Sequence, residues 1–390
     1  MTMLLLAVIY LIFISLGLPD SLLGAGWPAM QASFDVPSSW AGYVAMTISC
    51  MTILSAFLCP FLLRRFHTKW IVVFSILLTV LGMFGFSLSP WFPLLFLFAI
   101  PLGLGGGAID TVLNHYVANH YSSAVMNFLH CFYGLGAAIS PFIMGQALRV
   151  ARWNEGYSWT GFVQTGILLL ALLSLPLWKK NENREEKAKG GAGIREALGA
   201  PGVALTLAGF FAYCAGEATC SLWTASYFSG KYPELESGTA ASFGSLVFWG
   251  LMLGRLLSGF VSNKTGDKFL IRLGTVLEAA GILLILLPFP THLPAVAGFL
   301  LTGLGMAPIY PAIVHMAPPT FGERLSGAVI SLEMGFAYTG YTLMPTVFGE
   351  VQRAAGIGIL PWALLLFAGV TVAALEISYR QASKTSLLSA

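Results

Sequence analysis

The chain carries one apolar segment after another, each about as long as the hydrocarbon core of a bilayer is thick. A helix needs roughly 20 residues to cross that core. The twelve predicted spans are 3–33, 41–63, 70–89, 93–118, 124–148, 157–178, 201–229, 239–262, 268–289, 293–317, 325–349 and 356–379. Backbone amides in hydrocarbon must be bonded within their own segment, so each span should be an α-helix. The predicted fold class is an all-α membrane protein with twelve transmembrane helices.

The composition excludes several other classes of protein. Hydrophobic residues make up 57% of the chain and charged residues 9%, whereas soluble domains are about 25% charged. The net charge of +3 provides no electrostatic basis for a nucleic-acid partner. All five cysteines lie in apolar runs without the spacing of a metal site. We therefore expect no metal, no cofactor and no enzymatic activity.

One long polar stretch divides the chain near its middle. It runs from Lys179 to Gly199 and mixes basic residues with glutamates and a Gly190-Gly191 pair. This composition is typical of a linker. The predicted domains are an N-terminal six-helix bundle (1–178), a cytoplasmic linker (179–200), a C-terminal six-helix bundle (201–379) and a cytoplasmic tail (380–390).

The basic residues are unevenly distributed among the connections. With the N-terminus inside, 16 of the 20 lysines and arginines become cytoplasmic. The positive-inside rule takes such an asymmetry as an orientation, so both termini are predicted to be cytoplasmic. The first apolar run extends to about Phe34 without a cationic start, so it is predicted to be a retained span rather than a signal peptide. The expected location is the plasma (cytoplasmic) membrane.

Several motifs recur about 200 residues apart. Gly-Leu-Gly at 103–105 returns at 303–305, and Pro141 with Gly145 resembles Pro345 with Gly349. The offset is half the chain. The repeat predicts two pseudo-symmetric six-helix bundles related by an axis along the membrane normal, with substrate held between them.

An ionisable side chain within a predicted span is costly and is therefore a functional hypothesis, and four acidic residues stand out among those in the spans. These proton-coupling candidates are Asp20, Asp110, Glu217 and Glu333. Spans four and five should form a hairpin turning near 120–122, which brings His130 to the depth of Asp110 and makes it a further candidate. Two alternatives stay open: a structural hydrogen bond between the two helices at Asp110, and a helix cap after Pro19 at Asp20.

A second set of residues suits a neutral polyol, because amides pair with adjacent hydroxyls and aromatic rings stack on sugar faces. The alternative for each aromatic is a packing or interfacial role. The substrate-binding candidates are Trp27, Asn114, Asn127, Gln164, Trp223, Tyr227, Tyr310, Tyr338 and Tyr341.

Four stretches together resemble a known group. They are 103–107 followed by Asp110 and Asn114, 127–130 followed by 134–136 and Pro141, 213–217 with Trp223 and Tyr227, and 305–311. They are similar to the fucose/glucose-type sugar:proton symporters of the major facilitator superfamily. The resemblance implies proton-driven uptake of a monosaccharide, with Asp20 and Asp110 on the coupling spans. Asp110 stands where a glutamate is common in that family.

The loop after the eighth predicted span resembles the superfamily's cytoplasmic loop signature, in which glycines and basic residues latch neighbouring helices. The equivalent stretch of the first half keeps basic residues but lacks the usual acid and glycine. Simple positive-inside cations are the alternative interpretation. The gate candidates are Arg64, Arg65, Arg255, Asn263, Lys264, Gly266, Asp267 and Lys268.

Two other functions remain open at this stage. A proton-driven exporter of amphipathic compounds would also combine buried acids with an aromatic cavity. A membrane receptor or scaffold would bind a ligand without moving it. Sodium is an alternative to the proton as coupling ion. The favoured prediction is a monomer in the lipid bilayer that moves a neutral sugar with protons.

Overall fold

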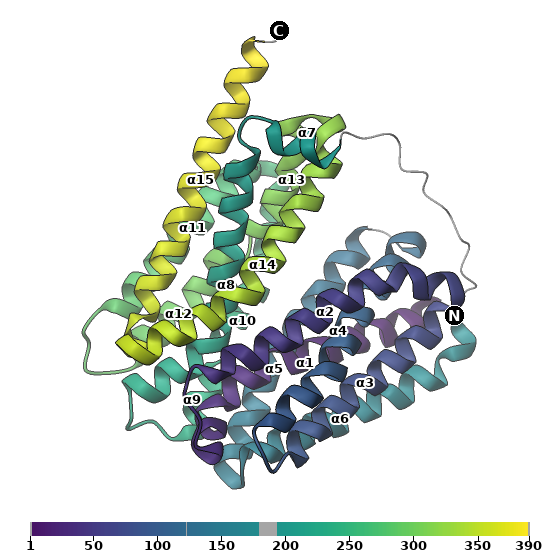
Figure 1. Cartoon of the computed structure of the whole chain (residues 1–390), viewed down its shortest axis with the longest axis vertical. Coiled ribbons are helices and arrows are strands. Elements are labelled where there is room, and N and C mark those ends of the chain that lie inside the picture. Colours follow the sequence, from purple (N-terminus) through teal and green to yellow (C-terminus); the bar gives the residue numbers. More distant parts are fainter. Residues whose placement is uncertain (1, 122, 179–192, 389–390) are drawn as a thin grey trace. The chain divides into compact units, whose positions relative to one another are not determined.

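The computed structural model describes residues 2–121, 123–178 and 193–388, and this part of the chain consists of helices and their connections. The first half contains α1 (Thr2–Phe34), α2 (Trp40–Arg65), α3 (Thr68–Leu88), α4 (Pro93–His120), α5 (Ser123–Val150), α6 (Trp153–Leu173) and the short η1 (Leu175–Leu177). The second half contains α7 (Ile194–Gly199), α8 (Val203–Lys231), α9 (Ser237–Phe243), α10 (Leu246–Thr265), α11 (Asp267–Leu286), α12 (Leu293–Met306), α13 (Ile309–Phe321), α14 (Glu323–Ala355), η2 (Ile357–Ile359) and α15 (Leu360–Leu388). Figure 1 traces them in order.

Every predicted span coincides with helix, which confirms the all-helical membrane fold. The eighth span consists of α9 and α10, and the tenth consists of α12 and α13 with Pro308 between them. Within the described residues, 11 spans are long and apolar enough to cross a membrane. The remaining predicted span is α14, which has 33 residues but carries more polar and charged side chains than the others.

Glycines with positive φ end two of the helices of the second half. Gly266 (φ 77°) separates α10 from α11, and Gly322 (φ 82°) separates α13 from α14. A side chain at either position would be strained, because residues with a Cβ avoid this region. These glycines therefore allow an abrupt change of direction where one span passes to the next.

The repeated Gly-Leu-Gly motif has the same packing role in both halves. Helix α3 packs against α4, and α11 packs against α12. A Cβ at Gly105 would overlap the carbonyl of Ser75 on α3, and one at Gly305 would overlap the backbone of Gly274 and Glu278 on α11. Close backbone approach of this kind is how small residues join transmembrane helices. The repeat in the sequence thus corresponds to a repeated helix contact.

The helices form two compact units. Unit 1 comprises Met1–Asn183, Ser221–Trp249 and Thr346–Gly358, and unit 2 comprises Arg184–Cys220, Gly250–Pro345 and Ile359–Ala390. Unit 1 thus combines α1–α6 with α9 and the C-terminal ends of α8 and α14. Most of the predicted linker, residues 179–192, lies outside the described residues. The division into two sequential bundles stays a prediction.

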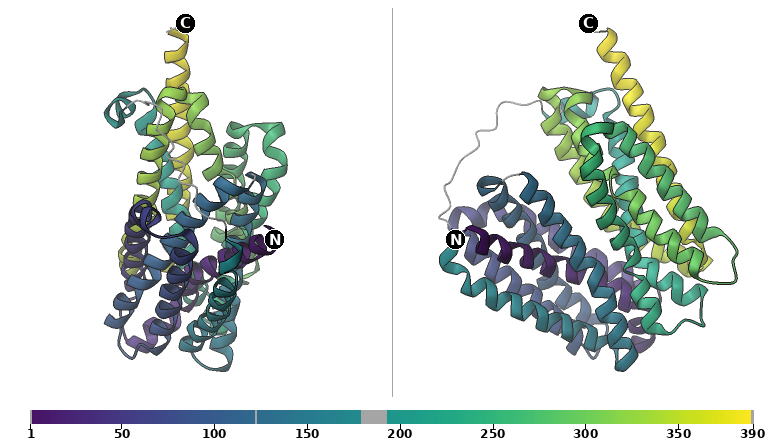
Figure 2. Two further views of the ribbon diagram at one scale, coloured as in Figure 1. Left: turned by 90° about the vertical axis from the view of Figure 1, so that its right-hand side faces the viewer. Right: turned by 180° about the vertical axis from the view of Figure 1, so that it is seen from behind.

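Within unit 1, α1 packs against α5, α6 and α9, while α4 packs against α2 and α3. The helices of the first half run alongside one another in all views (Figures 1 and 2). Within unit 2, the short helix α7 packs its apolar residues against α8, α13 and α14 (Figure 1).

Candidate functional site

Asp20 projects from α1 at a point where this helix lies unusually close to α5. A Cβ at Gly17 would overlap the Tyr133 carbonyl, and one at Gly136 would overlap the Ile14 carbonyl. At this short helix separation the Tyr133 hydroxyl donates a hydrogen bond of 2.5 Å to Asp20 Oδ2. The carboxylate is exposed on the surface of unit 1. The hydrogen-bond donor to Asp20 is thus a neutral side chain on the neighbouring helix.

Asp110 has its hydrogen-bond partner on its own helix. Asn114, one turn further along α4, donates its Nδ2 to Asp110 Oδ1 at 2.9 Å. The Asn114 Oδ1 is buried and has no hydrogen-bond partner among the described residues. Asp110 is partly exposed and lies within range of an electrostatic interaction with Asp20. The two acids therefore belong to one polar region on α1, α4 and α5.

The predicted hairpin of the fourth and fifth spans is present, with α4 ending at His120 and α5 beginning at Ser123. His130 is exposed, and its ring meets Phe13 of α1 edge-on with centroids 6.1 Å apart. The interaction of His130 with Asp110 stays a prediction. The side chain of Asn127 lies outside the described residues.

Glu217, a proton-coupling candidate, lies next to Arg255, a gate candidate. Its Oε2 accepts a hydrogen bond of 2.5 Å from Tyr213, one turn earlier on α8. Its Oε1 lies 3.8 Å from Arg255 Nη2 on α10. Both charged side chains are partly shielded, with 28% of Arg255 and 18% of Glu217 exposed. The sequence places Arg255 in a gate and Glu217 in a proton site, whereas the structure makes them an ion pair within unit 2.

This ion pair provides a prediction about stability. Replacing Arg255 with leucine should lower the free energy of unfolding by about 1 kcal/mol, because a partly shielded carboxylate loses its cation. The Arg255→Leu/Glu217→Gln double variant should recover most of that loss. Thermal unfolding of the two single variants, the double variant and the parent in detergent forms a double-mutant cycle. Strictly additive effects would show that the two side chains do not act as a pair.

Two further glutamates of unit 2 are buried. Glu333 on α14 has no exposed surface, and neither of its carboxyl oxygens has a hydrogen-bond partner among the described residues. Glu278 on α11 is 3% exposed. Glu333 was predicted from its position in a span, but its isolation from polar partners becomes apparent only in the folded chain.

Four of the predicted sugar-binding residues are buried by packing. Trp27 has no exposed surface, and its Nε1 donates to the Ser38 carbonyl at 2.8 Å. Gln164 is equally buried and donates its Nε2 to the Ser15 carbonyl at 2.9 Å. Trp223 packs edge-on against Phe348, with centroids 5.9 Å apart, and Tyr227 packs among aromatic rings. In this conformation these side chains stabilise unit 1.

The other aromatic candidates lie together on unit 2 and are more accessible. Tyr338 and Tyr341 on α14 are 43% and 38% exposed. Tyr310 on α13 is half-buried, stacks edge-on against Phe210 and bonds through its hydroxyl to Met334 on α14. With Asn114 on unit 1, these tyrosines are the predicted substrate residues that the described structure leaves accessible.

The gate candidates of the two halves have different surroundings. Arg64 and Arg65 are exposed in the last turn of α2, where cations favour the negative end of the helix dipole. In the second half Asp267 accepts a hydrogen bond of 2.8 Å from His315 Nδ1, and Lys268 Nζ lies 5.4 Å from the centre of the Tyr379 ring. The side chains of Asn263 and Lys264 lie outside the described residues.

Sequence reasoning missed an extensive set of contacts in unit 1, at the end where α1 stops and α2 begins. We call this set the helix-end interlock. It joins residues of α2, α5 and the connection before α2 to residues at and near α9 and at the end of α14. Its members are Ser38, Gly42, Tyr43, Gly145, Arg149, Glu236, Gly238, Thr239, Ser242, Thr346, Glu350 and Gln352.

The interlock combines polar bonds with close backbone approach. Arg149 lies 3.4 Å from Glu236 and donates to Thr239 at 3.1 Å. Thr346 donates to the Gly42 carbonyl at 2.8 Å, and a Cβ at Gly42 would overlap Thr346. A Cβ at Gly145 would overlap Ser242. In the sequence, the repeated Pro141 and Gly145 could have indicated a close helix contact in this region. The residues that Gly145 contacts on α9 could not be inferred, because they lie far away in the sequence.

Comparison with known proteins identifies a matching family and two similar individual proteins. Residues 9–247 match the profile of the Major Facilitator Superfamily. The chain is 26% identical to membrane protein MosC of Rhizobium meliloti over 271 residues, which span 66% of this chain and 61% of MosC. It is 24% identical to the glucose/mannose transporter GlcP of Bacillus subtilis (strain 168) over 318 residues, which span 74% of this chain and 76% of GlcP.

Solved structures agree on the fold. A variant of the nucleoside transporter NupG matches with a TM-score of 0.79 at 13% identity, covering 97% of this chain and 99% of that one. The peptide transporter POT in complex with sulfate matches with a TM-score of 0.76 at 14% identity, covering 97% and 95%. A bacterial homologue of the human lysosomal transporter Spinster matches with a TM-score of 0.71 at 12% identity, covering 97% and 96%. At such identities the likeness concerns the fold alone.

Proposed function

Since the chain belongs to the major facilitator superfamily of secondary transporters, we propose that it takes up a neutral monosaccharide together with protons by alternating access. The protein is a multi-pass integral membrane protein, and its family moves small molecules rather than catalysing reactions. The proton coupling and the sugar substrate are the proposed parts.

The observation that carries the proposal is the polar surrounding of Asp20 and Asp110. Each carboxylate accepts a hydrogen bond from a neutral group, Tyr133 or Asn114. Among the described residues no lysine or arginine forms an ion pair with either acid. Binding a proton therefore leaves no partner cation stranded in a medium where an unpaired charge is costly. Such acids can be loaded and unloaded during a cycle.

The sugar class is supported by the accessible neutral groups and by one relative. Asn114 on unit 1 and the exposed tyrosines of α14 offer amide, hydroxyl and ring surfaces, which suit a hydroxylated ligand. GlcP of B. subtilis, a glucose/mannose transporter, shares similarity over 318 residues. We accordingly favour glucose or mannose as the first substrates to test.

The orientation follows from the distribution of basic residues. We propose that both termini are cytoplasmic, in a plasma membrane. The helix-end interlock then lies on the extracellular side, and its contacts close the outer entrance. Opening that entrance requires the Arg149–Glu236 and Thr346–Gly42 contacts to separate in each cycle.

Uptake of radiolabelled glucose into proteoliposomes tests the function directly. With an inwardly directed proton gradient, we expect accumulation that a protonophore abolishes, and proton entry that glucose stimulates. A sodium gradient at equal pH on both sides should give no accumulation. Accumulation driven by sodium alone would contradict proton coupling.

The same vesicles separate the alternative functions. Lipophilic cations that stimulate proton release in place of glucose-stimulated uptake would favour an exporter. Glucose binding without counterflow, the exchange of labelled for unlabelled sugar across the membrane, would favour a receptor. The expected result is counterflow of glucose and mannose in the absence of any gradient.

A further inference from the structure

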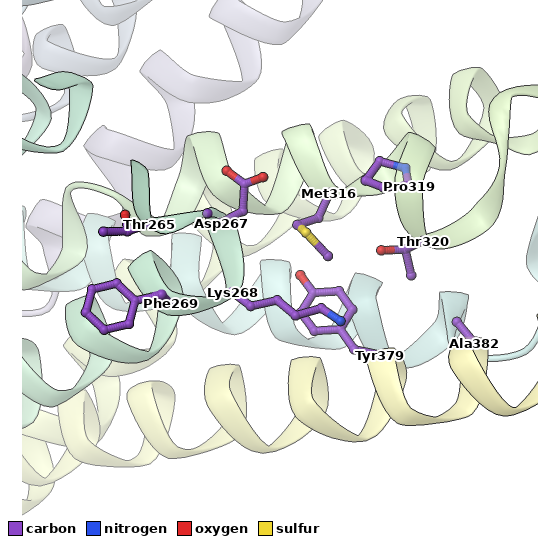
Figure 3. A pocket seen from close by; sticks show the side chains of 10 residues that line it. Thr265, Asp267, Lys268, Phe269, Met316, Pro319, Thr320, Tyr379 and Ala382 are labelled. Carbon is purple, nitrogen blue, oxygen red and sulfur yellow. The ribbon is translucent and has the colours of Figure 1, made fainter. Parts of the chain in front are cut away.

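A pocket in unit 2 lies where α11 begins, beside α13 and α15. Its volume is about 380 Å³, within the range of about 300–1,000 Å³ that small-molecule sites occupy. Figure 3 shows the Lys268 side chain extended across the pocket beside the Tyr379 ring, and the ammonium group lies 5.4 Å from the ring centre. Asp267 and Thr320 also line the pocket. The lining therefore combines a cation, a carboxylate and a hydroxyl group.

The pocket lies at the level where exposed apolar side chains give way to charged ones. On α11, the exposed side chains of Phe269, Leu273 and Val276 form a stripe on one face of the helix. On α15, the exposed Ile377 is followed by the exposed Arg380. Phe269 also lines the pocket, so the apolar stripe of α11 leads into it. With the cytoplasmic termini proposed above, this level is the inner surface of the bilayer.

The two carboxylates closest to this level already have partners. Asp267 accepts a hydrogen bond of 2.8 Å from His315. Glu376 on α15 accepts two hydrogen bonds from Arg272 on α11, at 2.6 and 2.9 Å. Among the described residues, no carboxylate lies within ion-pair distance of the Lys268 ammonium group. Lys268 is therefore available to an anionic ligand in the pocket.

A second cation lies at the same end of unit 2. Lys268 lies one turn before Arg272 on α11, and Arg380 lies one turn after Glu376 on α15. The Arg272–Glu376 ion pair holds the two helices together at one level. Lys268 and Arg380 are therefore both one turn nearer the cytoplasmic end than this pair. With Asp267 included, three cations face two carboxylates here, and the surplus positive charge favours an anion.

We propose that the pocket binds the headgroup of phosphatidylglycerol, an anionic phospholipid, from the cytoplasmic leaflet. The lipid phosphate binds the Lys268 ammonium group, and the headgroup hydroxyls donate to Asp267 and bond to Thr320. The acyl chains follow the apolar stripe of α11. Basic pockets between membrane helices on the cytoplasmic side suit anionic headgroups in this way. The site goes beyond the proposed sugar transport, and only its leaflet depends on the proposed orientation.

Native mass spectrometry of the purified protein measures this preference. The protein receives equal amounts of phosphatidylglycerol and phosphatidylcholine with the same acyl chains, and the first bound lipid is identified. The parent should retain phosphatidylglycerol. Lys268→Met keeps an unbranched side chain without its charge, and it should lower the preference roughly fivefold, the effect of one cation near an anionic lipid. Lys268→Arg should keep the preference. A parent without preference, or a Lys268→Met variant that retains it in full, would overturn the proposal.

Two further variants test whether the pocket itself is the site. Lys231→Met is the matched control, because Lys231 is an exposed lysine at the opposite end of a membrane helix, the last residue of α8. It should keep the preference of the parent. Ala382→Phe places a ring in the pocket lining without changing any charge, and it should lower the preference as Lys268→Met does. An unchanged preference in Ala382→Phe would show that the lipid binds outside the pocket and would overturn the site.

Other phosphate compounds identify the group that is recognised. Phosphatidylethanolamine should bind more weakly than phosphatidylglycerol, because its ammonium group cancels the lipid charge. Equal or tighter binding would overturn the anionic class. Glycerol 3-phosphate and inorganic phosphate should not raise the thermal unfolding midpoint as phosphatidylglycerol does. Equal stabilisation by either would assign the pocket to a soluble phosphate and overturn the lipid. None of these measurements uses a sugar, so a failure of glucose transport leaves their outcome unaffected.

Discussion

Replacing Asp110 with asparagine is expected to abolish proton-driven accumulation of glucose while sparing its exchange across the membrane. Asparagine has nearly the same shape and keeps an oxygen that can accept the Asn114 hydrogen bond, but it cannot bind and release a proton. Each pH unit across the membrane supplies about 1.4 kcal/mol per proton, enough for about tenfold accumulation. Without coupling through Asp110, the internal glucose concentration should only equal the external one.

The measurement compares two assays on the same vesicles, accumulation under a proton gradient and counterflow without one. Asp35→Asn is the matched control, because Asp35 is an exposed residue after α1 with φ 53°, a conformation that asparagine tolerates well. Its accumulation should equal that of the parent. An Asp110→Asn variant that accumulates glucose as the parent does would remove Asp110 from coupling.

The second large effect is expected when Gly145 in the helix-end interlock is replaced by leucine. Even a Cβ at this position would overlap Ser242 and the Gly238 carbonyl of α9. The backbones of α5 and α9 cannot move apart to make room without losing the contacts of Arg149 with Glu236 and Thr239. An overpacked contact costs about 1–3 kcal/mol, which shifts the closing equilibrium by roughly 5- to 150-fold. The uptake rate should fall by a factor within that range.

Gly166→Leu is the matched control for this substitution. Gly166 lies within α6, and a Cβ there meets nothing within 4 Å, so its uptake should be close to that of the parent. A cysteine introduced at Ser38 in a background without native cysteines should react faster with an impermeant maleimide in Gly145→Leu than in the control. Equal reactivity in the two variants would show that Gly145 does not govern closure.

The spans could be predicted because membrane helices form under a local constraint. Each segment must satisfy its own backbone hydrogen bonds in hydrocarbon, so length and apolarity suffice to locate it. Helix α14 shows the limit of this rule. Its acidic and basic residues lower its hydropathy below that of the other spans. It nevertheless forms a continuous helix of 33 residues, in which Glu350 accepts a hydrogen bond from Tyr43 of unit 1.

The repeated glycines were a second reliable signal. A Gly-Leu-Gly pattern repeated at half the chain length predicted two similar bundles, and both copies face a neighbouring helix at backbone distance. The helix contact depends on the absence of a side chain, and that absence is visible in the sequence. The sequence does not show which residue each glycine contacts, because that depends on how the two helices cross.

The sequence predicted the residue types of the candidate site, but not which side chains contact one another. The acids in the spans were visible as residue types, whereas the partner of Asp20 is Tyr133, 113 positions away. Arg255 had been assigned to the gate, yet it lies beside Glu217. Rotation of a helix about its axis decides which side chains meet, and an almost uniformly apolar segment has little amphipathic pattern from which to infer that rotation.

The sequence by itself determined the membrane class, the helical spans, the internal repeat and the family resemblance, because each depends on local composition or on spacing along the chain. Only the tertiary structure decided that Trp27 and Gln164 are buried in packing, that no described residue hydrogen-bonds the Glu333 carboxyl group, and that helix ends from both halves join in the interlock. Those features depend on which surfaces of different helices are brought together, and that is a property of the folded chain.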